Sequence, residues 1–277
     1  MSFLLSINNL RVTFPSRGGP VQVVKGVGFS MGRERVGIVG ESGSGKSQTG
    51  RAILGLTPAP GQATANQLEF DGIDLMQLSA LQWRKIRGKR ISMVMQDPKF
   101  SLNPVMTVAQ QLIEACQVHT KIPKADARAK SIKMLEAVQI NDVQRVMGAY
   151  PHELSGGMGQ RVMIAMMLIA EPELLIADEP TSALDVTVQI EVLKILDQLV
   201  SERGMGLIFI SHDLRLVSSF CDRVLVMYAG VIVEEIKASD LMNAKHPYTQ
   251  GLLNCLPSIN NHVRPLPTLQ RDEAWAK

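Results

Sequence analysis

Residues 40–47, with the sequence GESGSGKS, have the types and spacing of a phosphate-binding loop, G-x-x-x-x-G-K-[ST]. The apolar run at 36–39 predicts a buried strand before the loop, and a helix is expected after it, over residues 48–54. Glycines allow consecutive backbone N–H groups to surround a phosphate, and the N-terminus of a helix adds partial positive charge. We expect Lys46 to reach the β- and γ-phosphates of a nucleotide and Ser47 to ligate Mg²⁺.

A second set of reactive side chains follows at residues 174–180, with the sequence LLIADEP. Four apolar residues predict a buried strand that ends at Asp178 and Glu179, and these two side chains should point in different directions because strand side chains alternate. Asp178, at the end of the strand, can hold Mg²⁺ beside a phosphate loop, and Glu179 can polarise an attacking water. The alternative is a solvated acidic strand end, which the phosphate loop in the same chain disfavours.

Residues 154–161, with the sequence LSGGMGQR, form a second candidate anion site. Ser155, Gly156 and Gly157 would open a helix with bare backbone N–H groups, which attract a phosphate. The chain therefore carries two phosphate-binding devices more than a hundred residues apart, and one nucleotide does not obviously need both on one subunit. Two copies placed head to tail would use both devices at each of two sites, so the sequence predicts a sandwich dimer.

The composition of the chain limits the classes of protein to which it can belong. Its 277 residues carry 29 Lys and Arg against 26 Asp and Glu, and the net charge of +3 is too small to indicate nucleic-acid binding. No apolar run approaches the roughly 18 residues of a membrane-spanning helix, and the N-terminus lacks the pattern of a secretory signal. Cys116, Cys221 and Cys255 are too widely spaced for a metal or disulfide framework, so we expect ordinary thiols in a reducing cytoplasm.

The elements that must position these groups follow from the hydrophobic periodicity. Residues 3–35 predict short antiparallel strands, and residues 100–170 are mostly helical in pattern, with Thr107 as the expected N-cap of the first helix. Apolar runs further along the chain are typical of parallel strands buried on both faces, so an α/β fold is expected. The predicted strands are 4–7, 11–14, 21–24, 28–31, 67–70, 91–95, 174–177 and 206–210, with a hairpin from 223–227 and 230–234; the predicted helices are 78–87, 108–118, 124–138 and about 156–170.

In the order of these motifs the chain resembles the ATP-binding cassette (ABC) ATPases, over about residues 3–255. The matching segments are Walker A at 40–47, the Q-loop glutamine Gln96, the signature at 154–158, Walker B at 174–178, the catalytic glutamate Glu179, the D-loop at 182–185 and the switch histidine His212. Phe14 stands where the family has an aromatic side chain that stacks on adenine, although it could equally be a core residue. The resemblance implies an ABC-type nucleotide-binding domain with a P-loop (RecA-like) core, an antiparallel β subdomain, an inserted helical subdomain at about 98–170 and a C-terminal tail at 256–277.

The resemblance also implies a role for each matching residue, with ATP as the substrate and Mg²⁺ as the cofactor. Glu179 would act as the general base, while His212 would hold the γ-phosphate and position Glu179. Gln96 would join Ser47 and Asp178 in coordinating Mg²⁺. The residues expected to contact nucleotide, in this chain or across a dimer, are Phe14, Gly40, Glu41, Ser42, Gly43, Ser44, Gly45, Lys46, Ser47, Gln48, Ser155, Gly156, Gly157 and Asp185, the last of which would help to join the two sites.

A closer resemblance is to the ATPase subunits of dipeptide and oligopeptide importers. It rests on residues 95–108 around Gln96, on Met158 in place of the last signature glutamine, and on residues 246–249, HPYT. It implies separate partner chains: two integral-membrane permeases, a second and different ATPase and, indirectly, a solute-binding protein, with no nucleic acid. The chain would lie on the cytoplasmic face of the bacterial inner membrane. Some members carry a cysteine cluster for an iron–sulfur cofactor, which is not expected here because only Cys255 lies in the C-terminal extension.

Other substrates and other classes of protein stay open as alternatives. Importers of nickel or other small solutes share the same motifs. ABC ATPases that act on DNA or ribosomes are disfavoured because residues 40–178 contain no long coiled coil and the chain has a single cassette. Exporter cassettes are often fused to membrane spans, which this sequence lacks. A binder with an inactive site is disfavoured because Lys46, Asp178, Glu179 and His212 are all present.

Overall fold

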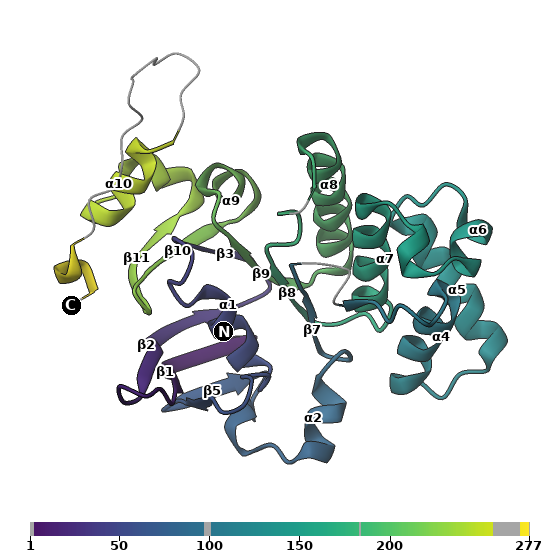
Figure 1. Cartoon of the computed structure of the whole chain (residues 1–277), viewed down its shortest axis with the longest axis horizontal. Helices are drawn as coiled ribbons and strands as arrows, with labels where there is room; N and C mark the ends of the chain where they lie inside the picture. Colours follow the sequence, from purple (N-terminus) through teal and green to yellow (C-terminus); the bar gives the residue numbers. More distant parts are fainter. Residues whose placement is uncertain (1–2, 97–100, 183, 257–271, 277) are drawn as a thin grey trace. The chain divides into compact units, whose positions relative to one another are not determined.

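The computed structural model describes residues 3–96, 101–182, 184–256 and 272–276 (Figure 1). These residues fall into two compact units: unit 1 combines the two ends of the chain, up to Gln77 and from Ile208, and unit 2 is Leu78–Leu207. Residues 97–100 of the expected Q-loop segment, residue 183 of the D-loop and residues 257–271 and 277 of the expected tail lie outside the described residues. The domain boundaries expected from the sequence stay predictions.

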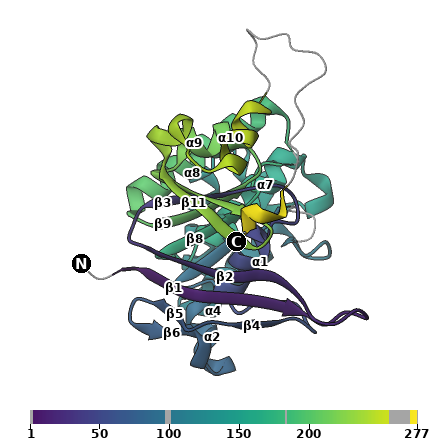
Figure 2. The ribbon, with the colours of Figure 1, turned by 90° about the vertical axis from the view of Figure 1, so that its left-hand side faces the viewer.

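An antiparallel sheet forms one part of unit 1, and its strands lie side by side in Figure 2. These strands are β1 (Leu5–Phe14), β2 (Val21–Met31), β4 (Gln62–Thr64), β5 (Gln67–Phe70) and β6 (Ile73–Asp74). They follow the order β2-β1-β5-β6, with β4 also paired to β1. The expectation of four short strands within residues 3–35 is wrong. Two long strands form instead, because the pairing of β1 with β2 absorbs its irregularities as shifts in register and continues past them.

The other strands of unit 1 lie in the order β11-β10-β3-β9. β3 (Arg35–Val39) runs parallel to β10 (Arg223–Tyr228), which pairs antiparallel with β11 (Val231–Lys237), so the predicted hairpin is confirmed. β9 (Gly206–Ser211) begins at the end of unit 2 and continues into unit 1. The helical segments in the described part of unit 1 are α1 (Lys46–Ile53), α9 (Leu214–Phe220), α10 (Pro247–Asn254) and the 3₁₀ turns η1 (Leu75–Gln77), η3 (Ala238–Asn243) and η4 (Glu273–Ala276).

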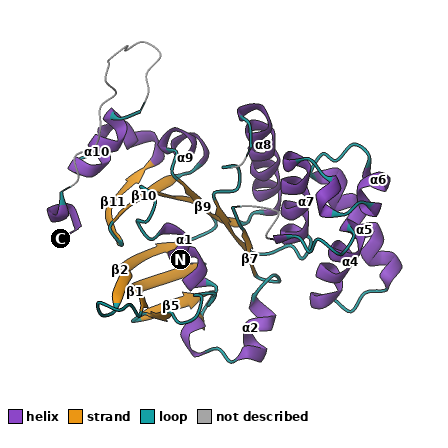
Figure 3. Ribbon diagram, viewed as in Figure 1, coloured by secondary structure: helices purple, strands orange, loops and turns teal. Residues whose placement is uncertain are grey.

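Unit 2 is mostly helical (Figure 3). Its strands β7 (Ile91–Val94) and β8 (Leu174–Asp178) pair in parallel, and every residue of both is buried, as expected for strands covered on both faces. The helical segments in its described residues are α2 (Ala80–Ile86), α4 (Val108–His119), α5 (Lys124–Ala137), α6 (Val143–Gly148), α7 (Gly156–Leu168), α8 (Val186–Arg203) and the 3₁₀ turn η2 (Pro151–Glu153). Across the described residues of both units, no helix has the length and apolar character that crossing a bilayer requires.

Side-chain caps explain where two helices of unit 2 begin. The hydroxyl of Thr107 accepts a hydrogen bond from the N–H of Gln110, and the side-chain oxygen of Gln110 accepts one from the N–H of Thr107. The predicted N-cap of α4 is therefore confirmed. α6 begins after Asp142, whose carboxylate accepts from the N–H of Arg145. The sequence analysis does not predict α6, because a helix of six residues has too few turns to show a period.

The strand that leads into the phosphate loop packs closely against α9. A Cβ added at Gly37 in β3 would lie 2.1 Å from Val217 Cγ1 and 3.2 Å from Cys221 Sγ. Burial raises the pKa of the Cys221 thiol to about 12, with a further contribution from Asp222, so this thiol stays protonated at neutral pH. The strand and the helix can approach this closely because residue 37 has no side chain.

We expect Gly37→Ala to lower the free energy of unfolding by about 1–3 kcal/mol, because the methyl group forces β3 and α9 apart. Denaturant titration followed by circular dichroism measures the change. Gly32→Ala is the matched control, since a Cβ at Gly32 meets nothing within 4 Å. Its effect should stay within about 0.5 kcal/mol. Equal stability of the two variants would show that the contact between β3 and α9 is not tight.

Candidate functional site

The phosphate loop, residues 40–47, joins β3 to α1 in unit 1. Gly40 and Gly45 have φ angles of 154° and 102°, which glycine adopts far more readily than other residues. Space restricts these positions as well: a Cβ on Gly40 would lie 2.1 Å from Met227 O, and one on Gly45 would lie 2.6 Å from Val23 O. The predicted loop residues, from residue 40 to residue 48, all lie in this turn and in the start of α1, whose N-terminus meets the loop.

The amine of Lys46 is held against the loop backbone. The side chain is almost entirely buried, with 5% of the residue exposed, and its Nζ donates to Gly40 O at 2.8 Å and to Glu41 O at 2.9 Å. Ser44 Oγ and Gln48 Oε1 are buried without a hydrogen-bond partner among the described residues. Leaving such an atom unpaired costs about 1–3 kcal/mol, which a ligand can recover. A held cation, a glycine-rich backbone and two unpaired polar atoms together fit a nucleotide phosphate and its metal ion.

Tyr248 contacts the same loop from α10, and the sequence analysis assigns it no role. The residue is fully buried, and its hydroxyl oxygen accepts a hydrogen bond at 3.0 Å from the N–H of Glu41. His246 caps α10 through Nδ1, and the Tyr248 ring packs against Tyr228 at 4.5 Å and Trp275 at 5.8 Å between centroids. A buried tyrosine hydroxyl needs a hydrogen-bond partner, but the sequence shows neither that Tyr248 is buried nor that the loop is its partner.

His212 and Phe14 are the other predicted site residues of unit 1. His212 directly follows β9 and is exposed. Asp213 beside it caps α9 by accepting hydrogen bonds from two backbone N–H groups, so the residue next to the histidine is fixed to a helix. Phe14 ends β1 and is half-buried, with Gly61 close to its ring: a Cβ there would lie 2.4 Å from Phe14 Cε1. Both readings of Phe14, adenine contact and core residue, fit this position.

In unit 2 the structure brings Gln96 and Glu179 together. Gln96 follows β7 and Glu179 follows β8, and Gln96 Nε2 donates to Glu179 Oε2 at 3.2 Å. Asp178 is 4% exposed while Glu179 is half-buried, as expected from the alternation of strand side chains. Glu179 has a φ angle of 46°, a left-handed conformation that is uncommon outside glycine. The chain therefore turns sharply at the carboxylate that the sequence analysis assigns to water activation.

The signature segment, residues 154–158, opens α7. The hydroxyl of Ser155 caps the helix, and Gly156 is exposed at its first turn. Gly157 lies against α8: a Cβ there would be 2.5 Å from Val188 Cγ1. The glycines thus serve two purposes, since one leaves the N-terminus of the helix open and the other allows two helices to pack closely.

Asp185 has a structural partner that the sequence analysis does not predict. Its carboxylate accepts a hydrogen bond at 3.0 Å from the N–H of Val188 and caps α8. Two apolar side chains of the first turns of this helix are exposed, Val186 at 71% and Ile190 at 49%. Val186 and Ile190 are four residues apart, so the two exposed apolar side chains are neighbours on one face of the helix.

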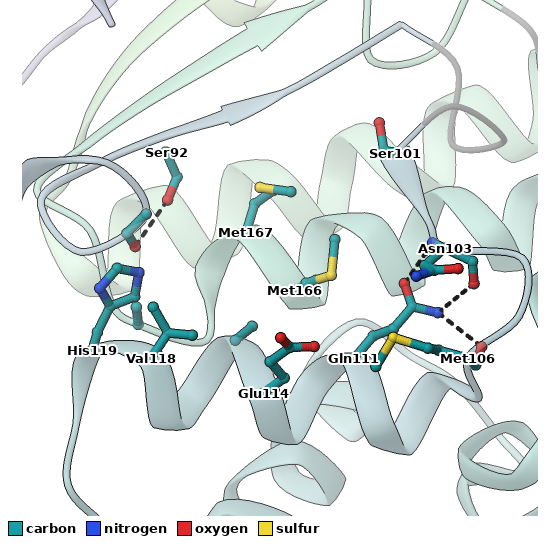
Figure 4. A pocket seen from close by; sticks show the side chains of 13 residues that line it. Ser92, Ser101, Asn103, Met106, Gln111, Glu114, Val118, His119, Met166 and Met167 are labelled. Carbon is teal, nitrogen blue, oxygen red and sulfur yellow. Dashed lines mark hydrogen bonds between the residues drawn. The ribbon is translucent and has the colours of Figure 1, made fainter. Parts of the chain in front are cut away.

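Unit 2 also has a cavity of about 340 Å³ that runs along α4 (Figure 4). One wall is the loop that leads into α4, held by Gln111, which donates to Asn103 O at 3.1 Å and to Met106 O at 3.0 Å. His119 lies at the end of the cavity opposite this loop. Desolvation, and secondarily the charge of Lys89, lowers the pKa of His119, so its imidazole is neutral at pH 7. The lining residues are Gly88, Ser92, Ser101, Asn103, Met106, Gln111, Glu114, Ala115, Val118, His119, Met166, Met167 and Ala170.

We expect Tyr248→Phe to loosen the start of the phosphate loop, because the N–H of Glu41 loses its acceptor. A neutral hydrogen bond contributes about 1 kcal/mol, so exchange of this amide proton should become roughly fivefold faster. Amide hydrogen exchange resolved at Glu41 is the measurement. Tyr228→Phe changes the same aromatic cluster and should leave the exchange of this amide unchanged. Equal exchange in both variants would contradict the loop contact.

Comparison with known proteins agrees with these motifs. The sequence profile of the ABC transporter family matches residues 24–182. The oligopeptide transport ATP-binding protein OppD of Escherichia coli strain K12 is 47% identical over 259 residues, which cover 93% of this chain and 77% of that protein. OppD of Bacillus subtilis strain 168 is 45% identical over 261 residues, covering 93% and 73%.

Solved structures extend the similarity to the fold. The dimeric ATP-binding cassette MJ0796 in a post-hydrolysis state, bound to ADP and Pi, superposes with a TM-score of 0.76 at 26% identity, covering 84% of this chain and 98% of that one. CbiO1 of Clostridium perfringens, part of the ABC transporter complex cbiONQ, gives 0.74 at 27% identity, covering 88% and 92%. Since the family profile spans more than half of the chain, and relatives at 45–47% identity span over nine-tenths of it, the chain belongs to the ABC transporter family.

Proposed function

We propose that this chain is an ATP-hydrolysing subunit that powers the import of oligopeptides through separate permease subunits. The observation that carries the ATPase assignment is the phosphate loop, with the buried amine of Lys46 held over it. The similarity to OppD proteins, which are named for oligopeptide transport, supports the substrate class. An ABC cassette with bound ADP and Pi shares the fold, which supports hydrolysis as the reaction.

The proposed function gives each predicted site residue a role in hydrolysis. In unit 1, Lys46 and the loop amides would hold the triphosphate, and His212 would contact the γ-phosphate. In unit 2, Glu179 would accept a proton from the attacking water. The Gln96 amide nitrogen already donates to Glu179, so the carboxylate has a partner that fixes its orientation.

The proposed magnesium ligands are Ser47, Asp178 and Gln96. A hydroxyl, a carboxylate and an amide oxygen are the hard oxygen donors that Mg²⁺ prefers. The amide nitrogen of Gln96 donates a hydrogen bond to Glu179, and the amide oxygen of Gln96 is the atom suited to bind a cation. When bound, Mg²⁺ neutralises negative charge on the β- and γ-phosphates.

We further propose that the chain acts in a dimer of ATPases, with a different homologous chain as its partner. Ser155, Gly156 and Gly157 would meet the partner's nucleotide at the open N-terminus of α7. Val186 and Ile190, exposed beside Asp185, would be covered by the partner. ATP binding would then favour the closed dimer because each nucleotide contacts both chains, and hydrolysis would release it.

The cavity of Figure 4 is the proposed docking site for a permease subunit on the cytoplasmic face of the inner membrane. Met106, Met166 and Met167 give it an adaptable apolar lining, and Val118 at its edge is 66% exposed. Such a lining suits a short apolar segment of a partner protein.

We expect Glu179→Gln to bind ATP normally and to lower turnover by about 10²–10⁴-fold, the range for a lost general base. ATP affinity and phosphate release are measured on the complex of this chain with its permeases and a partner ATPase whose own catalytic glutamate is replaced. Glu202→Gln, an exposed carboxylate of α8, serves as the control and should keep wild-type turnover. Turnover near the wild-type rate in Glu179→Gln would overturn the base assignment.

We expect capture of the full chain in mild detergent to recover two membrane permeases and a second ATPase, identified by mass spectrometry. Val118→Glu should lower permease recovery at least tenfold, because it places a charge at the edge of the docking cavity. Leu81→Glu changes an exposed leucine outside the cavity and should not affect recovery. Recovery of DNA-associated or ribosomal proteins without any membrane protein would overturn the transport assignment.

A further inference from the structure

Gln160 is a polar side chain in the buried part of α7. Only 1% of the residue is exposed, and residues on the same side of the helix, such as Met163 and Ile164, are fully buried. A buried amide is costly unless it is hydrogen-bonded. The Nε2 of Gln160 donates to the carbonyl oxygen of Pro180, so α7 is tied by one side chain to a specific backbone position.

That backbone position directly follows Glu179. The left-handed φ of 46° at Glu179 is unfavourable for a residue with a Cβ, so the surrounding contacts must hold it. From within the loop, the N–H and hydroxyl of Ser182 donate to Glu179 O at 3.3 and 3.2 Å. From outside the loop, Gln160 donates a hydrogen bond to the carbonyl oxygen of Pro180. This carbonyl is the single main-chain hydrogen-bonding group that a proline has. The turn at Glu179 is thus fixed on both sides.

The helix that carries Gln160 is the one that begins with the signature segment. Ser155 caps it, and the N–H of Gly159 donates to Ser155 O at 2.8 Å, so the first turn is regular up to the position before Gln160. The backbone hydrogen bonds of an α-helix tie each residue to the one four positions earlier, so Ser155 and Gln160 are linked through consecutive turns of the same helix. A displacement at its N-terminus therefore reaches the carbonyl of Pro180 directly through the Gln160 side chain.

We propose that Gln160 is a positioning residue that couples the signature segment to the backbone of Glu179. This rests on the proposed function, in which the signature segment meets the partner's nucleotide and Glu179 activates water in the chain's own site. Gln96 orients the carboxylate from β7, and Gln160 orients the backbone from α7. ATP bound by the partner chain thereby sets the geometry of the base in this chain, which links the two hydrolysis sites through a single amide.

The test compares Gln160→Met with the wild type in the complex of permeases and both ATPases. The partner ATPase carries a replaced catalytic glutamate, so that it binds ATP without hydrolysing it. Methionine matches the length of glutamine and has no donor. We expect kcat to fall tenfold or more while the KM for ATP changes less than twofold, because the phosphate loop is untouched. Wild-type kcat in this variant, with normal folding, would overturn the proposal.

Arg203→Met is the matched control. Arg203 donates to Leu168 O at 2.8 Å, a side chain–carbonyl bond at the opposite end of α7. This variant should lose a similar amount of thermal stability and keep kcat within twofold of the wild type. A tenfold loss of kcat in Arg203→Met would show that any loosening of α7 impairs turnover, and it would contradict a specific role for Gln160.

Gln160→Glu provides a second readout in case the methionine variant does not fold. A protonated glutamic acid keeps one O–H donor for Pro180 O, whereas the carboxylate has none. The titration of this carboxyl in the variant is first located by NMR, because burial raises the pKa of a carboxyl. The ratio of kcat in the variant to that of the wild type should rise as the pH is lowered through this titration, and a ratio that stays flat across it would contradict the proposal. Glu179→Gln in the same complex separates the two hypotheses. If it remains active, the proposed base is wrong; if it is inactive while Gln160→Met is fully active, the coupling alone is wrong.

Discussion

Two backbone carbonyl groups decide how closely the phosphate loop can be packed, and the chemistry of unit 1 depends on that packing. Met227 O in β10 faces Gly40, and Val23 O in β2 faces both Gly45 and Gly230, at distances that no Cβ could occupy. Because main-chain oxygens make these contacts, changes of side chain in β2 or β10 cannot relieve them. Two strands therefore set the shape of the loop before nucleotide binds. Nucleotide binding does not have to supply the free energy that ordering the loop would require.

The placement of the charged groups likewise limits the free-energy cost of burying them. The amine of Lys46 exchanges water for two loop carbonyls, which keeps a cation inside the protein at an acceptable cost. In unit 2, Asp178 is buried and its neighbour Glu179 is half-buried. A group that holds a ligand can be enclosed, whereas a group that exchanges a proton with water must be reachable. The burial of these side chains is consistent with the roles proposed for them, Asp178 as a magnesium ligand and Glu179 as the base.

Contiguous motifs were predictable, and contacts between distant segments were not. The phosphate loop, the cap at Thr107 and the hairpin of β10 and β11 depend on neighbouring residues, whose types and spacing are visible in the sequence. The contacts of Tyr248 with the loop and of Gln160 with Pro180 join residues 207 and 20 positions apart. A buried tyrosine or glutamine signals that a partner exists, but only the fold identifies it. The bulged strand β1 escaped prediction because its irregular register is specified by its partner strand.

The position of Trp275 has an optical consequence. Its ring forms an edge-to-face pair with the ring of Tyr228, with the centroids 5.7 Å apart. The centroid of Trp275 also lies 5.8 Å from that of Tyr248, whose hydroxyl is hydrogen-bonded to the phosphate loop. The chain has two tryptophans, and the other, Trp83, lies in unit 2 beneath the guanidinium of Arg87. With Trp83 replaced by phenylalanine, the intrinsic fluorescence would come from one indole, next to the residue that holds the loop. Nucleotide binding could then be followed in real time without attaching a dye.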